Sequence, residues 1–460
     1  MPRLPINPAR LTLLLQVQGA LGGRAILDSL GISSATLTRW VAQLGPVIER
    51  MGAARSSRYA LRRPVRNLGS QWPIYRIGDD GRARVWGELR ALHGGFRFVP
   101  TETPPGWMPE HPDGLFSGLP FFLQDIRPQG YLGRAIARDA APRLGVPEDL
   151  RRWSDDDALG YFLTDGHDLP GDLVLGDHAL ERALRSQQEV ERIAISNTDR
   201  DRVYPDRAAA AQRGELVGSS AGGEQPKFLA TVQRAQGQLQ PVLVKFSAAD
   251  ASAVSQRWAD LLQCEHVAAH TMRQRRIVSA STTVIDAGNR RFLEVERFDR
   301  PAATGRRGLI TLGTLEDAFL ENSSSDWAAA AGMLQAGNWI SVEESRLLRW
   351  IWCFGSLIAN TDMHRANASF WFGDELPWRL TPFYDMLPML YAPGAQGDLS
   401  ERSFSPRPPL PGVADVWRAA AAAAEEFWGR VSEDPAVSSG FQRIAAGNLR
   451  IVQGLVSRFV

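Results

Sequence analysis

The stretch SSAGGEQPKFLATVQRAQGQLQPVLVKFS, residues 219–247, holds both lysines of the chain, Lys227 and Lys245. Every other basic residue among the 52 is arginine. Lys245 lies near the end of the apolar run PVLVKF, which predicts a β-strand. A lysine on a buried strand is unfavourable unless its charge is paired. Its compact ammonium suits phosphate oxygens, where the planar fork of arginine demands a different geometry. Lys245 is therefore a candidate phosphate contact.

The segment before Lys227 is rich in glycine and serine. Gly222 and Gly223 allow close backbone approach, so that amide groups could line a phosphate near Lys227. The pattern is neither GxGxxG nor a Walker A sequence. By the glycines alone, an ordinary turn is the better interpretation. The confinement of lysine to this stretch favours a phosphate loop.

A set of polar residues follows in LIANTDMHRANASFWF, residues 357–372, and RLTPFYDML, residues 379–387. Asp362 and Asn367 have the spacing of the base and the metal-binding residue in kinase catalytic loops, and Asp385 ends a later strand-like run. Phosphoryl transfer needs a carboxylate base and oxygen ligands for Mg²⁺. His364 could orient Asp362, although a hydrogen-bonding role within the loop is the better interpretation. The alternative to a catalytic loop is an ordinary solvent-exposed loop in which Asp and Asn cap a helix. Each of these residues on its own would favour that alternative.

Residues 1–66 carry ten arginines against two acidic residues, in a chain whose formal net charge is +1. Apolar spacing predicts helices over 11–18, 24–30 and 34–44, with a glycine turn before the third, which is the helix-turn-helix pattern. VIERMGAARSSRYALRR then predicts a two-stranded wing. This favours DNA binding, with a dimerisation or docking module as the alternative. The candidate DNA contacts are Ser34, Thr36, Thr38, Arg39, Arg55 and Arg58.

Other features restrict the class of protein. The two cysteines, Cys264 and Cys353, form no CxxC pair, which disfavours a zinc site or a disulfide framework and fits a reducing, cytoplasmic setting. No stretch has the length of a membrane helix, and no signal peptide is expected. His93, His111, His167 and His178 have no second metal-binding residue at a useful spacing. They are therefore expected to be structural or surface residues.

From about Phe96 onward, the chain resembles the HipA family of bacterial serine/threonine kinase toxins. The motifs that carry the resemblance are SSAGGEQPKF, VLVKFS, LEVERFDR, NTDMHRANASF and LTPFYD. The resemblance implies an α+β chain with a two-lobed, protein-kinase-like fold behind the winged helix-turn-helix. The expected divisions are a DNA-binding domain at 1–66, a β-rich subdomain at 67–145, a kinase N-lobe at 146–300 and a helical C-lobe at 301–460.

The same resemblance implies roles for single residues. Lys245 would contact ATP, with Gly222, Gly223, Lys227 and His364 also near the nucleotide. The other implied roles are Glu296 and Phe298 as the hinge at adenine, Asp299 at the ribose, Asp362 as the base, Asn367 and Asp385 as Mg²⁺ ligands, and Ser220 as the autophosphorylated serine, with Ser219 as its competitor.

Two departures from the family pattern stand out. The founding HipA relies on a separate DNA-binding antitoxin, whereas this chain carries its own helix-turn-helix and resembles the fused YjjJ-like (HipH-like) branch. Asp385 is followed by Met386 and Leu387, so a DFG-type flip is not expected.

The function expected from the resemblance is ATP- and Mg²⁺-dependent phosphorylation of a protein, such as an aminoacyl-tRNA synthetase or a translation factor. The first alternative is a DNA-binding regulator whose kinase-like domain only senses nucleotide. The second is a metal-dependent, nuclease-like toxin. DNA is an expected partner, a membrane is not, and the sequence leaves a homodimer open.

Overall fold

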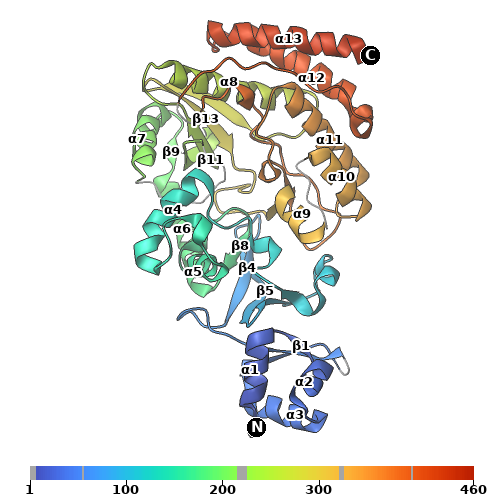
Figure 1. The fold of residues 1–460 in the computed structure, drawn as a ribbon. Coiled ribbons are helices and arrows are strands. Elements are labelled where there is room, and N and C mark those ends of the chain that lie inside the picture. Colours follow the sequence, from blue (N-terminus) through green and yellow to red (C-terminus); the bar gives the residue numbers. More distant parts are fainter. Residues whose placement is uncertain (1–6, 54–55, 215–224, 321–325, 395–396, 460) are drawn as a thin grey trace.

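The computed structural model describes residues 7–53, 56–214, 225–320, 326–394 and 397–459 (Figure 1). The expected positions Arg55, Ser219, Ser220, Gly222 and Gly223 lie outside the described residues. The N-terminal module and the last two helices lie at opposite ends of the molecule, with two five-stranded sheets between them.

The N-terminal module contains three helices and a small sheet of strand order β1-β3-β2. Its elements are α1 (Ala9–Gln18), β1 (Leu21–Gly22), α2 (Gly23–Leu30), α3 (Ser34–Leu44), β2 (Ile48–Met51) and β3 (Arg58–Leu61). Gly31 ends α2 in the left-handed conformation, which glycine adopts without a Cβ penalty. Ser33 caps α3 by accepting a hydrogen bond from the backbone N–H of Thr36. The three helices lie where the apolar spacing predicts them.

The N-terminal module is fixed to the rest of the chain by buried charge. Glu49 is only 3% exposed and accepts hydrogen bonds from Arg62 at 2.6 and 2.9 Å, from Arg90 at 2.5 Å and from Arg97. Arg63 reaches across to Asp156 with two bonds of 2.6 and 2.8 Å. Part of the basic surplus of residues 1–66 is therefore neutralised inside the molecule.

The middle region is an antiparallel sheet of order β7-β6-β5-β4-β8 with helices packed on it. Its elements are β4 (Gln71–Ile77), β5 (Ala83–Leu92), β6 (Gly95–Pro100), β7 (Leu115–Phe116), α4 (Gly130–Leu144), α5 (Asp155–Asp165), β8 (Leu173–Leu175) and α6 (Asp177–Ile193). Strand β8 pairs with β4. The sheet of this region thus extends beyond the division expected at residue 145, because a late strand returns to its edge.

The second sheet has the order β12-β13-β11-β10-β9. Its strands and the helices packed against it are β9 (Ile195–Ser196), α7 (Arg200–Arg213), β10 (Lys227–Gln233), β11 (Leu239–Phe246), α8 (Ala253–Gln274), β12 (Thr282–Ala287) and β13 (Arg290–Glu296). Strands β10 and β11 form an antiparallel hairpin in which Lys227 is the direct partner of Lys245. The two lysines of the chain are therefore cross-strand neighbours.

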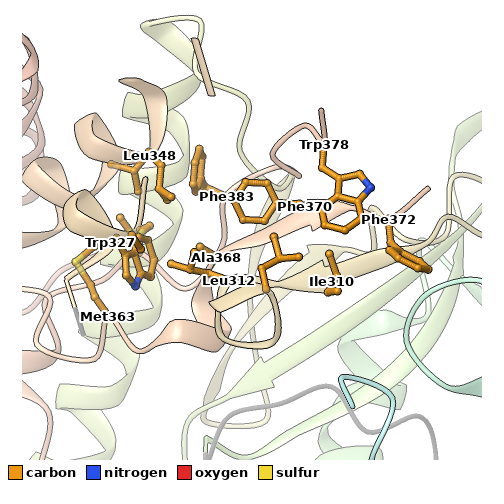
Figure 2. Packing of buried hydrophobic residues seen from close by; sticks show 14 of the residues in the cluster. Ile310, Leu312, Trp327, Leu348, Met363, Ala368, Phe370, Phe372, Trp378 and Phe383 are labelled. Atoms are coloured by element: carbon orange, nitrogen blue, oxygen red, sulfur yellow. The ribbon is translucent and has the colours of Figure 1, made fainter. Parts of the chain in front are cut away.

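The C-terminal half is mostly helical and carries a short two-stranded antiparallel sheet of β14 and β15. Its elements are β14 (Leu309–Thr311), α9 (Leu312–Phe319), α10 (Trp327–Ala336), α11 (Val342–Leu357), β15 (Ser369–Trp371), α12 (Ala414–Glu433) and α13 (Ser439–Phe459). Figure 2 shows the buried apolar core around residues 363–370. Met363, Ala368 and Phe370 pack there against apolar side chains from earlier and later parts of the chain. A Cβ on Gly355 of α11 would come within 2.3 Å of the Met363 sulfur, so Met363 packs directly against the α11 backbone and would have to shift for a larger residue. The core thereby holds the polar loop at 360–367 in place.

In the parts of the chain that the structure describes, no helix combines the length and the apolar character needed to cross a membrane.

We expect Glu49→Ala to lower the free energy of unfolding of the N-terminal module by about 2 kcal/mol, because three arginines lose a shared buried carboxylate and are only partly rehydrated. Chemical denaturation combined with limited proteolysis at residues 62–70 measures the effect. Asp28→Ala is the matched control, since Asp28 pairs with Arg24 at an exposed site. Equal, small effects in both variants would show that Glu49 does not hold the module.

Candidate active site

Lys245 is the centre of the candidate site. Its Nζ donates to both carboxylate oxygens of Glu265 on α8, at 2.7 and 2.8 Å, and also to Asp385. Lys245 is only 4% exposed. Burial alone would lower the pKa of this ammonium, but the carboxylates of Asp385 and Glu265 outweigh it and raise the pKa above its usual range. Lys245 is therefore a charged lysine that joins the second sheet to the C-terminal half.

Asp385 and Asp362 are held to one another through Asn360. The side-chain oxygen of Asn360 accepts from the backbone N–H of Asp362 at 3.0 Å, and its amide nitrogen donates to the backbone oxygen of Asp385 at 3.2 Å. Asp385 has a φ of 58°, a conformation that costs energy in a non-glycine residue and is often found at functional sites. The spacing between the two acidic residues is thus fixed by a third side chain.

The two carboxyl groups have opposite pKa shifts. Burial raises the pKa of Asp362, with a further increase from Asp385 and an opposing effect of His364. Burial would also raise the pKa of Asp385, but Lys245 and Lys227 overcome it and hold that pKa below its usual range. The Asp385 carboxyl group is therefore ionised at neutral pH, and Asp362 is the more basic of the two.

Asn367 and His364 complete the loop. Asn367 donates its amide N–H to the backbone oxygen of Asp362 at 2.8 Å, which leaves its amide oxygen as the atom that a metal could use. His364 accepts from the backbone N–H of Ala366 at 3.3 Å at the start of a short 3-10 turn. Oxygen donors of the Asp385 and Asn367 type are the ligands that Mg²⁺ prefers.

A cavity of about 200 Å³ contains most of these groups. We call it the lysine cavity. The residues that line it include Lys227, Lys245, Glu265, Glu296, Phe298, Asp299, His364, Asn367 and Asp385. Asp362 is not among the lining residues and is joined to the cavity through Asn360 and Asn367. The middle region contributes Asp125, Gln129 and Pro170 to the same wall.

The segment after β13 forms one edge of the lysine cavity. The ring of Phe298 contacts those of Tyr384 and Trp371, with centroids 5.6 and 5.8 Å apart. Glu296 faces Arg234 at 3.4 Å. The role of Glu296 and Phe298 as an adenine hinge stays a prediction.

Asp299 is buried in a network of charges. It accepts from Arg297 at 2.8 and 3.0 Å, from Arg300 at 2.8 Å and from the backbone N–H of Gly171 at 3.1 Å. Burial would raise the pKa of Asp299, but the two arginines hold it far below its usual range. The predicted contact of Asp299 with a ribose would have to be shared with these partners.

Three contributors to the site were not predicted from the sequence. Glu265 carries a weak signal, since it is one of two acidic residues on the helix that follows the lysine strand, the other being Asp260. Asn360 precedes Asp362 by two residues and could have been suspected as a loop-fixing amide. Asp125, which accepts from Thr311 and Thr314 at 2.7 to 2.9 Å, comes from the middle region and gives no signal of its own.

The described residues form no group of three or more His, Cys, Asp or Glu side chains arranged to hold a metal. The lysine cavity instead contains the Lys245 ammonium, which is fixed between the carboxylates of Glu265 and Asp385. It also contains the amide group of Asn367. This arrangement can bind the phosphates of a nucleotide together with a hard cation.

Comparison with known proteins identifies the family. A family model described as "YjjJ-like toxin, middle domain" matches residues 68–184, and one described as "HipA-like C-terminal domain" matches residues 219–437. Toxin YjjJ of Escherichia coli strain K12 is 37% identical over 434 residues, which is 94% of each chain. The chain belongs to the HipA-like toxin family. The resemblance inferred from the motifs is thereby confirmed.

One solved structure agrees with this family at the level of the fold. A chain of the Shewanella oneidensis MR-1 complex of HipA, HipB and operator DNA matches with a TM-score of 0.50 and 16% identity, over 84% of this chain and 97% of that one. The Helicobacter pylori proinflammatory kinase CtkA covers 51% of this chain and 90% of its own, with a TM-score of 0.36 and 14% identity, which is too low to show a shared fold. The HipA-like toxin thus has the mixed α+β fold that was expected.

We expect Asp299→Asn to lower the free energy of unfolding by about 3 kcal/mol at neutral pH, because Arg297 and Arg300 keep their buried charges and lose a carboxylate. The folded-state pKa of Asp299 is depressed, so its contribution is complete above about pH 4 and is lost as the pH falls through the folded-state pKa. Urea unfolding of the two proteins at a series of pH values should show a constant difference down to about pH 4 that shrinks below it.

Asp149→Asn is the control for this prediction, because Asp149 pairs with Arg151 at the surface. A difference between wild type and Asp299→Asn that stays the same in acid would contradict the ionised state assigned to Asp299.

Proposed function

We propose that this HipA-like toxin is an Mg²⁺- and ATP-dependent protein serine/threonine kinase. The observation that supports this most is the contact of Lys245 with both Glu265 and Asp385 in the lysine cavity, beside Asn367. Protein kinases require a lysine paired with a helix glutamate and an aspartate that binds Mg²⁺. In this chain, Lys245 comes from β11, Glu265 from α8 and Asp385 from the C-terminal half.

Each residue has a defined task in this proposal. Lys245 and Lys227 bind the negative charge of the phosphates, and Glu265 fixes the direction of the Lys245 ammonium. Asp385 and the amide oxygen of Asn367 would hold Mg²⁺, which neutralises phosphate charge when bound. Asp362 accepts the proton of the attacking hydroxyl, for which its raised pKa is favourable.

The protein substrate and self-modification belong to the same proposal. A serine or threonine of a translation factor or an aminoacyl-tRNA synthetase is the proposed acceptor. Ser220 is the proposed site of autophosphorylation and lies outside the described residues. Its position before β10, the strand of Lys227, supports this proposal.

We expect Asp362→Asn to reduce phosphate incorporation from ATP by about 10²–10⁴-fold, because the hydroxyl proton loses its acceptor. Nucleotide binding should persist, since the groups lining the lysine cavity are unchanged. Radiolabel transfer and calorimetric titration with ATP and Mg²⁺ measure the two properties, and mass spectrometry identifies the modified residue. Asp201→Asn, at an exposed position on α7, is the control.

Three outcomes would contradict the kinase proposal or parts of it. Unchanged incorporation in Asp362→Asn would remove this residue from the role of base. Nucleotide binding by the wild type without any transfer would favour the regulator. Metal-dependent nicking of DNA without ATP, lost in Asp385→Ala, would favour the nuclease.

We further propose that the N-terminal module is a winged helix-turn-helix that binds DNA. The supporting observation is the free polar face of α3, on which Ser34, Thr38 and Arg39 are exposed. Thr36 is partly buried and contacts Ser33 and Arg39. Arg58 of β3 donates to the backbone oxygen of Ala20 at 3.4 Å, so its guanidinium is partly used within the module.

We expect Arg39→Ala to weaken binding to a short random-sequence duplex about tenfold at low salt and to reduce the salt dependence of the affinity by about one phosphate contact. Fluorescence anisotropy at several salt concentrations measures both. Arg443→Ala on α13 removes an equal charge from the opposite end of the molecule and should have no effect. Identical affinities for the two variants would argue against α3 as the DNA-facing helix.

A further inference from the structure

A second cavity, of about 650 Å³, adjoins the lysine cavity. We call it the arginine cavity. Trp371 lines it, and the same ring contacts Phe298, which lines the lysine cavity. The charged residues that line the arginine cavity are Arg76, Arg82, Arg84, Arg306, Arg307 and Arg379, with Asp79, Asp80 and Asp172. Arginine thus exceeds aspartate on its walls.

The walls of the arginine cavity are preformed. The turn at 78–81 lies directly against the loop at 304–308, and the backbone N–H of Arg306 donates to the oxygen of Gly78 at 3.0 Å. A Cβ on Gly305 would come within 2.2 Å of the backbone oxygen of Asp79, so the loops could not approach this closely with any other residue there. Two segments far apart in the sequence therefore form one fixed concavity.

The aspartates of the arginine cavity already have arginine partners. Asp172 accepts from Arg76 at 2.7 Å, and Asp79 accepts from Arg307 at 2.6 to 3.0 Å. Asp80 lies 3.8 Å from Arg82. The carboxylates on the wall therefore do not neutralise the remaining arginines.

Among the described residues, three arginines of the arginine cavity have no carboxylate oxygen closer than 4.0 Å. Arg306 is 6% exposed; one of its amino groups donates to the backbone oxygen of His167 at 2.7 Å, and the other has no acceptor among the described residues. Burial, reinforced by Arg300, lowers the pKa of Arg306 to about 9, although the nearby carboxylates of Asp168 and Asp299 oppose this shift. The side chain of Arg379 is 83% exposed and lies 4.0 Å from Glu344, so this pair, like that of Arg82 with Asp80, is weak. For Arg84, an exposed residue, the described part of the chain shows no carboxylate partner.

We infer that the arginine cavity binds a small anion with more than one phosphate group, using Arg84, Arg306 and Arg379. Guanidinium forks match phosphate oxygens in pairs, and a buried one without an acceptor is unfavourable until an anion arrives. Three excess positive charges in a cavity of this volume suit a diphosphate or triphosphate better than a single carboxylate. The inference does not depend on the proposed kinase activity.

Calorimetric titration with inorganic pyrophosphate, without Mg²⁺, tests this site on the full chain. Arg84→Ala combined with Arg379→Ala should weaken binding at least about tenfold, because two charge-assisted contacts are lost. Both residues are exposed, so folding should be unaffected. Arg306→Met is the more direct change, but it alters a buried residue and requires circular dichroism to confirm the fold.

The matched control is Arg443→Ala combined with Arg450→Ala, which removes the same charge from exposed positions on α13. Pyrophosphate affinity in this variant should equal that of the wild type. Equal weakening in both double variants would show a non-specific charge effect and would overturn the inference.

Lys245→Met separates the two cavities. Pyrophosphate binding that survives in Lys245→Met and is lost in the Arg84/Arg379 variant supports the arginine cavity. The reverse pattern would place the anion in the lysine cavity and overturn the inference. Failure of pyrophosphate to bind, with a single-stranded oligonucleotide that does bind through Arg84 and Arg379, would also overturn it and assign the surface to a nucleic-acid backbone.

Discussion

The buried ammonium of Lys245 is the interaction on which the candidate site depends. It lies between Glu265 of α8 and Asp385 of the C-terminal half. A charge buried this deeply is strongly unfavourable without partners, so the sheet, the helix and the C-terminal half are constrained to stay in contact. The same constraint keeps Asp385 ionised and places it in the lysine cavity.

Local features of this arrangement could be predicted from the sequence, and the long-range pairing could not. The apolar run predicted the strand of Lys245, and the spacing of Asp362 and Asn367 predicted a polar loop. Glu265 could not be singled out, because its pairing depends on how α8 is rotated against the sheet. Asn360 was also missed, since its hydrogen bond to the backbone of Asp385 joins segments 25 residues apart, although its bond to Asp362 is local.

The formal charge of residues 1–66 overestimates the positive charge on the surface of the N-terminal module for a similar reason. The module is strongly basic by composition, but Arg63 and Arg66 pair with Asp156 and Asp157, which lie outside residues 1–66. Tertiary structure brings these partners together, so a formal charge over residues 1–66 overstates the free positive surface. Arg39 on the exposed face of α3 remains available to an acidic polymer.

These buried charge clusters also limit how the molecule can move. Glu49 joins the N-terminal module to the middle region, and Asp299, through Gly171 and the arginines beside it, joins the middle region to the edge of the lysine cavity. Breaking the charge cluster of Glu49 or that of Asp299 would leave several buried charges unpaired, at a cost of several kcal/mol. A ligand could move the parts relative to one another only by binding the separated arrangement better by at least that amount. The N-terminal module and the HipA-like residues 219–437 are therefore expected to move as one rigid body. A ligand that binds the N-terminal module would then change the position of the lysine cavity but not its shape.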